Sequence, residues 1–75
     1  MTLTEVPVNS TVLASIAYDA SGSILQVKFC NGAIYGYSAV PTVVYHSLLA
    51  ADSKGSYFNR EIRARFPHTL LRRPA

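Results

Sequence analysis

Basic side chains concentrated in the last third of the chain have the clearest chemical potential. Residues 54–75 carry six lysines and arginines against one glutamate, a balance of +5, whereas residues 1–53 have a balance of −2. Arg60 and Arg63 are spaced for one exposed side of a helix, with Lys54 just upstream. A row of cations can neutralise consecutive phosphates and release their counterions. The pattern predicts a nucleic-acid-binding face at these three residues, although the two arginines also suit the solvated face of an amphipathic helix.

Tyr35 and Tyr37 are the second candidate binding feature. Side chains two residues apart on a strand share one face of the sheet, so both rings are expected to point the same way. On an open face they would stack on the bases of single-stranded nucleic acid. On a face covered by helices they would be core residues whose hydroxyls reach the rim. The small core of so short a chain favours packing, and base stacking is the alternative.

Nucleophilic or metal-assisted catalysis finds little support in the sequence. Cys30, the single cysteine, would need a base and a group that orients this base, and His46 and His68 form no recognisable pattern with it. The same histidines, together with Asp19 and Asp52, lack the spacing of metal ligands. We therefore expect a protein that is not an enzyme and that needs no metal and no cofactor.

Length and composition indicate one small globular domain. The chain has 75 residues, of which 49% are hydrophobic and 15% charged, and these values argue against disorder. A single cysteine excludes an intramolecular disulfide and suits a reducing compartment. The N-terminus lacks the order of a secretory signal, and the uncharged stretch 29–51 contains too many polar residues for a membrane span. We expect a cytoplasmic protein with no membrane contact.

Alternating hydrophobicity predicts three antiparallel strands in the first half of the chain. Residues 15–19 and 25–30 alternate, and the segment between them is rich in turn-forming residues. Asn31-Gly32 is the favoured pair for a two-residue type I′ turn, because both residues tolerate positive φ. This turn makes residues 33–38 the third strand of a meander.

Two short helices are expected to follow the strands. Val40-Pro41 ends the sheet, and proline suits the first turn of a helix over residues 41–51. Gly55 is predicted to cap the end of this helix, and Ser53 or Ser56 to cap the start of the next. Each helix has an apolar stripe, and the second also spaces one carboxylate and one guanidinium for an ion pair. The stripes are Val44, Tyr45, Leu48 and Ala51, then Phe58, Ile62 and Phe66, and the ion pair is Glu61 with Arg65.

The predicted fold class is therefore α+β, with a three-stranded antiparallel β-meander followed by two short α-helices packed on one face. Residues 12–66 form the predicted domain. Residues 1–11 are expected to be an N-terminal tail or an edge strand, because Pro7 interrupts any period. Residues 67–75 are expected to be a mobile basic tail.

The ordered set of motifs resembles the KTSC domain, a small module named for the C-terminal end of some lysyl-tRNA synthetases and also found as a stand-alone protein of bacteria or phages. Its attachment to a tRNA synthetase implies RNA binding, although the function of the family is essentially undetermined. Asn59 and Arg63 are matching positions with no evident packing role. The resemblance covers residues 12–66 through Ser15-Ile16, Tyr18-Asp19, Leu25-x-Val27-x-Phe29, Gly32, Tyr35-x-Tyr37, Val40-Pro41, Tyr45, Leu48, Ala51-x-Ser53-x-Gly55, Tyr57-Phe58-Asn59 and Ile62-Arg63.

Two functional hypotheses from different classes follow. The first is a small non-enzymatic module that binds RNA or another nucleic acid through Lys54, Arg60 and Arg63, with Tyr35 and Tyr37 as further contacts. The alternative is a module for protein–protein interaction or homo-oligomerisation, with an apolar patch or an open sheet edge as its surface. The residues predicted to face outward on that surface are Ile34, Gly36, Val43 and Ala50.

Overall fold

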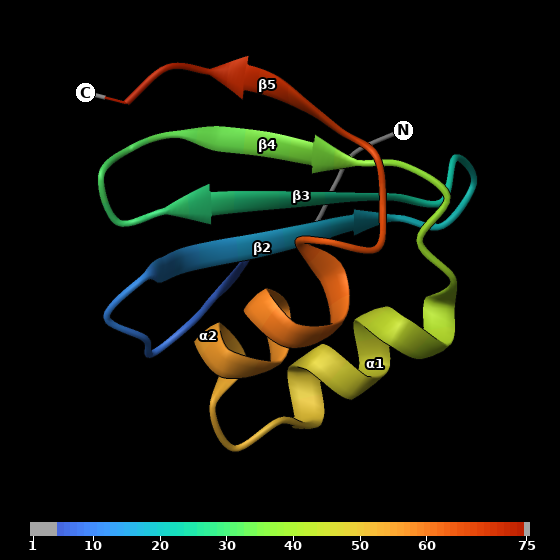
Figure 1. The fold of residues 1–75 in the computed structure, drawn as a ribbon, viewed down its shortest axis with the longest axis horizontal. Coiled ribbons are helices and arrows are strands. Elements are labelled where there is room, and N and C mark those ends of the chain that lie inside the picture. Colours follow the sequence, from blue (N-terminus) through green and yellow to red (C-terminus); the bar gives the residue numbers. More distant parts are fainter. Residues whose placement is uncertain (1–4, 75) are drawn as a thin grey trace.

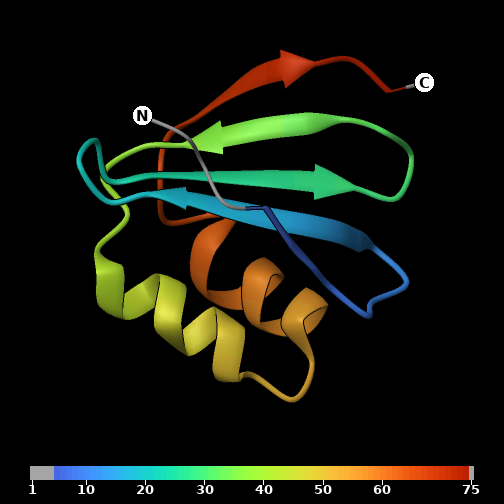
Figure 2. The same ribbon diagram turned by 180° about the vertical axis from the view of Figure 1, so that it is seen from behind.

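The computed structural model describes residues 5–74, and in this part of the chain five strands and three helical segments form two layers (Figure 1). The strands form one antiparallel sheet in the order β1-β2-β3-β4-β5. The helices lie together on one face of this sheet, as both views show (Figures 1 and 2). The elements are β1 (Glu5–Pro7), β2 (Leu13–Asp19), β3 (Ile24–Phe29), β4 (Ile34–Tyr37), α1 (Thr42–Ala50), α2 (Lys54–Tyr57), the π-helix η1 (Phe58–Ile62) and β5 (His68–Arg72).

The hydrophobic core lies between the helices and one face of the sheet. Leu25 and Val27 alternate on β3 and are fully buried, and Leu48 of α1 covers the same face from the helical layer. The mixed α+β class is thus confirmed, because the period-two pattern and the helical stripes converge on one core. Its buried members are Leu13, Ile16, Leu25, Val27, Tyr37, Val40, Leu48, Phe58 and Ile62.

The predicted number of strands is wrong, because the sheet has five strands and not three. The segment interpreted as an N-terminal tail or edge strand contributes β1, which pairs with β2. The segment expected to be a mobile basic tail contributes β5, which pairs with β4. Every residue of β5 is exposed, so this strand lacks the half-buried alternation by which a strand is recognised in a sequence.

The turn between β3 and β4 also differs from the prediction. Gly32 has a φ of 93°, whereas Asn31 is not at positive φ, so a type I′ turn is excluded. The Gly32 N–H donates to the Phe29 carbonyl at 2.9 Å, and the Phe29 N–H donates to the Ala33 carbonyl at 2.8 Å. The connection is therefore a three-residue loop with glycine in the left-handed region. Asn31 contributes its side chain, whose Oδ1 accepts from the Ala33 N–H at 3.0 Å.

The second helical segment begins as predicted and continues in an unexpected form. The Ser53 hydroxyl caps α2 by accepting from the Ser56 N–H at 3.3 Å. Gly55 lies inside α2, so its predicted role as the cap of α1 is wrong. From Phe58 the chain is a π-helix, in which the Arg63 N–H donates to the Phe58 carbonyl five residues back at 2.9 Å.

Candidate nucleic-acid interface

A groove on the helix-covered side of the sheet lies next to β4, β5 and the residue after η1. We call it the β4–β5 groove, and its volume is about 400 Å³. Tyr35 and Tyr37 reach it from β4, since alternate residues of a strand share a face. His68 reaches it from β5, because its backbone is paired with that of Tyr37. The complete lining is Val12, Phe29, Asn31, Ala33, Tyr35, Tyr37, Arg63, His68 and Pro74.

The aromatic rings of this groove pack against one another. The His68 ring lies 5.5 Å from the Tyr35 ring and 5.4 Å from the Tyr37 ring. Tyr37 packs edge-on against Phe58 at 5.3 Å, and Tyr35 packs edge-on against Phe29 at 5.7 Å. Tyr37 is only 3% exposed and Tyr35 is half-buried. The tyrosines therefore form one wall of the core and do not present a flat platform to a base.

Arg63 and Tyr37 are electrostatically coupled in the groove. Burial raises the pKa of the Tyr37 hydroxyl above its ordinary value of 10.0, whereas the positive charge of Arg63 acts in the opposite direction. The neighbouring Tyr35 adds to the increase. The phenol of Tyr37 is therefore a neutral hydrogen-bond donor at physiological pH, next to a permanent cation.

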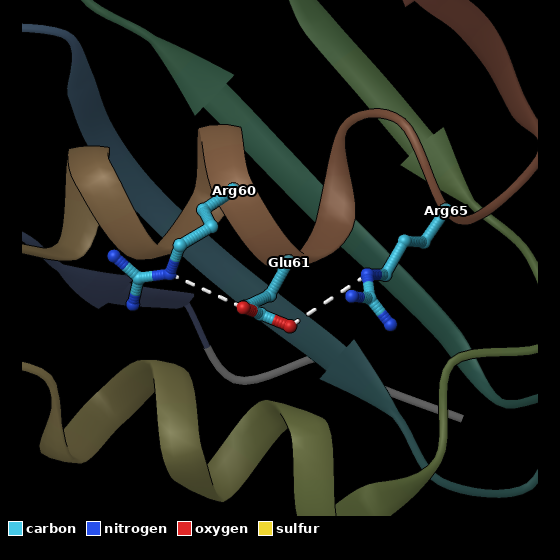
Figure 3. Close-up of polar contacts among 3 residues, drawn as sticks. All are labelled: Arg60, Glu61 and Arg65. Carbon is cyan, nitrogen blue, oxygen red and sulfur yellow. Dashed lines mark hydrogen bonds and ion pairs between the residues drawn. The ribbon is translucent and has the colours of Figure 1, made fainter.

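Arg63 differs from the neighbouring arginines in its partner. Among the described residues, the side chain of Arg63 forms one hydrogen bond, from a guanidinium nitrogen to the neutral Asn59 Oδ1 at 3.4 Å. Glu61, in contrast, binds Arg60 at 3.1 Å and Arg65 at 3.6 Å, as Figure 3 shows. The predicted ion pair of Glu61 with Arg65 is thus confirmed. Within residues 5–74 no carboxylate lies within ion-pair distance of Arg63, so its charge is available to an external anion.

The predicted row of cations is not continuous. The Arg60 guanidinium lies over the Tyr57 ring, 5.8 Å from its centroid, and lines a separate groove that also contains Asp52. The Lys54 ammonium donates to the Ala51 carbonyl at 3.1 Å. A π-helix turns less per residue than an α-helix, so residues three apart do not lie one above the other. The structure therefore brings Arg63 to the two tyrosines and leaves Lys54 and Arg60 elsewhere.

His68 and Asn31 are groove residues that the sequence did not assign to a site. His68 lay in the segment expected to be a tail, and the only signal that could place it was the pairing of β5 with β4. Within residues 5–74 no group of three histidines, cysteines, aspartates or glutamates is arranged to hold a metal ion. In the same residues no helix has the length and apolar character needed to cross a membrane.

Comparison with known proteins connects this geometry to a family. An uncharacterized protein of Stutzerimonas stutzeri is 47% identical over 55 residues, which are 73% of this chain and 78% of that one. A lysine–tRNA ligase of Nostoc punctiforme is 34% identical over 61 residues, which are 81% of this chain but only 11% of the ligase. The crystal structure of a KTSC domain protein from Yersinia pestis superposes with a TM-score of 0.89 at 29% identity, covering 95% of this chain and all of that one. The KTSC domain family model matches residues 9–66, and the chain belongs to this family.

Proposed function

We propose that this KTSC domain is a non-enzymatic module that binds RNA, with the β4–β5 groove as its contact surface and Arg63 as its principal phosphate ligand. The observation that carries the proposal is the difference between Arg63 and its neighbours on the same segment, because Arg60 and Arg65 share the Glu61 carboxylate while Arg63 bonds to an amide. A phosphate at Arg63 would not compete with a carboxylate for the guanidinium donors, and a guanidinium can bind a phosphate with two parallel hydrogen bonds.

The other groove residues support contact with the backbone of a nucleic acid. His68, Asn31 and the tyrosine hydroxyls are donors of the kind that bind phosphate and sugar oxygens. The aromatic rings are occupied with one another, so base stacking contributes little in this proposal. Binding of this kind has low sequence specificity and a steep dependence on salt.

The relatives favour RNA as the nucleic acid. The segment of the Nostoc punctiforme protein that is similar to this chain belongs to a protein named as a lysine–tRNA ligase. This chain spans about a tenth of that ligase, so the similarity concerns the small domain alone. A domain joined to a protein that handles tRNA lies close to RNA whatever its own role, and this proximity supports the choice of RNA over DNA.

The test is fluorescence anisotropy with a short labelled single-stranded RNA over a series of salt concentrations. We expect Arg63→Ala to weaken binding about tenfold, because a charge-assisted hydrogen bond is lost. We also expect it to lower the slope of log affinity against log salt by about 0.7, the value for one phosphate contact on a single strand. Arg65→Ala is the matched control, since it removes the same charge from an ion pair with Glu61.

Three results would contradict the proposal. The first is an absence of RNA binding by the wild-type chain at low salt. The second is equal weakening by Arg63→Ala and Arg65→Ala, which would mean that only the overall charge matters. The third is full affinity after Arg60→Ala and Arg63→Ala are combined.

A second candidate function is association with a protein or with another copy of the chain. The observation that favours it is the β5 edge, where Leu70 is 45% exposed and Leu71 is 51% exposed. A strand at the edge of a sheet offers unpaired backbone groups to another strand. The other edge is the three-residue β1, and its Pro7 lacks a backbone donor. The two edges thus differ, and β5 is the one open to pairing.

A further inference from the structure

The face of the sheet that the helices leave uncovered carries an ordered set of polar side chains. The strand registers align Ser15 of β2, Lys28 of β3, Ile34 of β4 and Arg72 of β5 in one row across this face. The next row begins at Glu5 of β1 and continues through Ala17, Gln26 and Gly36. Small residues lie beside long charged ones in both rows, and this difference in size produces a hollow.

The hollow is a pocket of about 180 Å³ with opposite charges on its rim. Glu5, Lys28 and Arg72 all line it, and they come from three different strands. Strands lie about 4.8 Å apart, so the backbones of Lys28 and Arg72, which share a row, are separated by about 10 Å. Glu5 lies two strands from Lys28 on the other side and in the next row. Within residues 5–74 none of these three side chains forms an ion pair.

Ser15 lies at the floor of the same pocket. The residue as a whole is only 5% exposed, and it lines the pocket together with charged side chains from three strands. The Gln26 amide is a second uncharged polar group on the lining. The pocket therefore offers a hydroxyl, an amide, two cations and one carboxylate to a ligand.

We infer that this pocket binds a small zwitterion of the α-amino-acid type. The ligand carboxylate would lie between Lys28 and Arg72, and its ammonium group would pair with Glu5. The Ser15 hydroxyl would bond to the carboxylate at the floor. A ligand with only negative charge, such as an RNA backbone, is disfavoured by the Glu5 carboxylate. The volume equals that of about six water molecules, which suits a ligand of about that many non-hydrogen atoms.

This inference is independent of RNA binding, because Arg63 and the β4–β5 groove lie on the opposite side of the sheet. The test is a titration of the ¹⁵N-labelled protein with L-alanine, followed through the amide chemical shifts. Acetate, ethylamine and inorganic phosphate are titrated separately at matched ionic strength. We expect saturable shifts at residues of the two rows with L-alanine, and about tenfold weaker binding for acetate and ethylamine, each of which lacks one ion pair.

Variants assign the two ends of the ligand. Lys28→Gln and Arg72→Gln should each lower the affinity for L-alanine about tenfold. Arg65→Gln, which lies outside the pocket, should leave this affinity unchanged. Glu5→Gln should make acetate bind as well as L-alanine, because the partner of the ammonium group is then gone. The dispersion of the amide resonances shows whether each variant is folded. Acetate or phosphate binding as tightly as L-alanine to the wild type would overturn the inference in favour of a simple anion site. No saturable shift, or shifts confined to the other face, would overturn it completely.

Discussion

Arg63 and Tyr37 show how one residue of a small domain can serve the core and a surface site together. Tyr37 is buried against the Phe58 ring and also lines the β4–β5 groove. Arg63 is exposed, and its charge acts on that hydroxyl. Packing and surface chemistry thus meet at these two residues. Their roles can therefore be separated only by changes that alter one property and preserve the other.

Substitution of Tyr37 separates packing from chemistry. We expect Tyr37→Ala to lower the free energy of unfolding by about 3 kcal/mol or more, because it leaves a cavity beside Phe58. Tyr37→Phe should cost far less, since the ring contact remains. The measurement is denaturant unfolding of both variants. A small loss in Tyr37→Ala would contradict the assignment of this ring to the core.

The pH dependence of stability gives a further readout for the same phenol. Because burial raises the pKa of Tyr37 in the folded state, the unfolded chain loses this proton first as pH rises. The stabilising contribution is therefore complete below about pH 10 and is lost as pH rises through the raised pKa. Tyr37→Phe should remove this part of the alkaline destabilisation, whereas an identical alkaline profile in the two proteins would contradict the assigned pKa direction.

At the scale of elements, the start of α2 depends on one side chain. Ser53 accepts from the Ser56 N–H, and the helix that follows carries Phe58 and Ile62 into the core. We expect Ser53→Ala to lower the free energy of unfolding by about 1 kcal/mol, the usual cost of losing an N-cap. Ser53→Asp is the matched control, because a carboxylate oxygen can accept the same bond. Thermal or denaturant unfolding measures both, and equal stability of the alanine and aspartate variants would contradict the cap.

Elements with a local signal were predictable from the sequence, and elements with a distant partner were not. The alternation around Leu25 and the stripe at Phe58 led to the correct core, because each pattern is complete within a few residues. β5 was not predicted, because its partner β4 is separated from it along the chain by all of the helical segments. The π-helical turn of η1 likewise has no local signature. It explains why Arg60 and Arg63 diverge, and so why only part of the candidate site was foreseen.

At the scale of the whole molecule, the open β5 edge sets the expected behaviour at high concentration. We expect the molar mass measured by light scattering to rise with protein concentration, and Leu70→Lys to suppress this rise, since a charge on an edge strand opposes pairing. Val43→Lys is the matched control, because Val43 is the more exposed apolar residue, at 67%, but lies on α1. A constant mass equal to one chain would exclude self-association. Suppression by Val43→Lys alone would move the contact to the helical layer.

The position of His68 has a consequence for the way ligand binding and chain architecture are linked. All five strands pair in chain order, but β5 joins β4 only after the helices have intervened, and it brings His68 onto the two tyrosines (Figure 1). A ligand held between His68 and Arg63 therefore binds only molecules whose last strand is docked. By mass action such a ligand holds that strand in place, and each local detachment of β5 releases the ligand. Occupancy of the groove thus reports whether the C-terminal strand is in place.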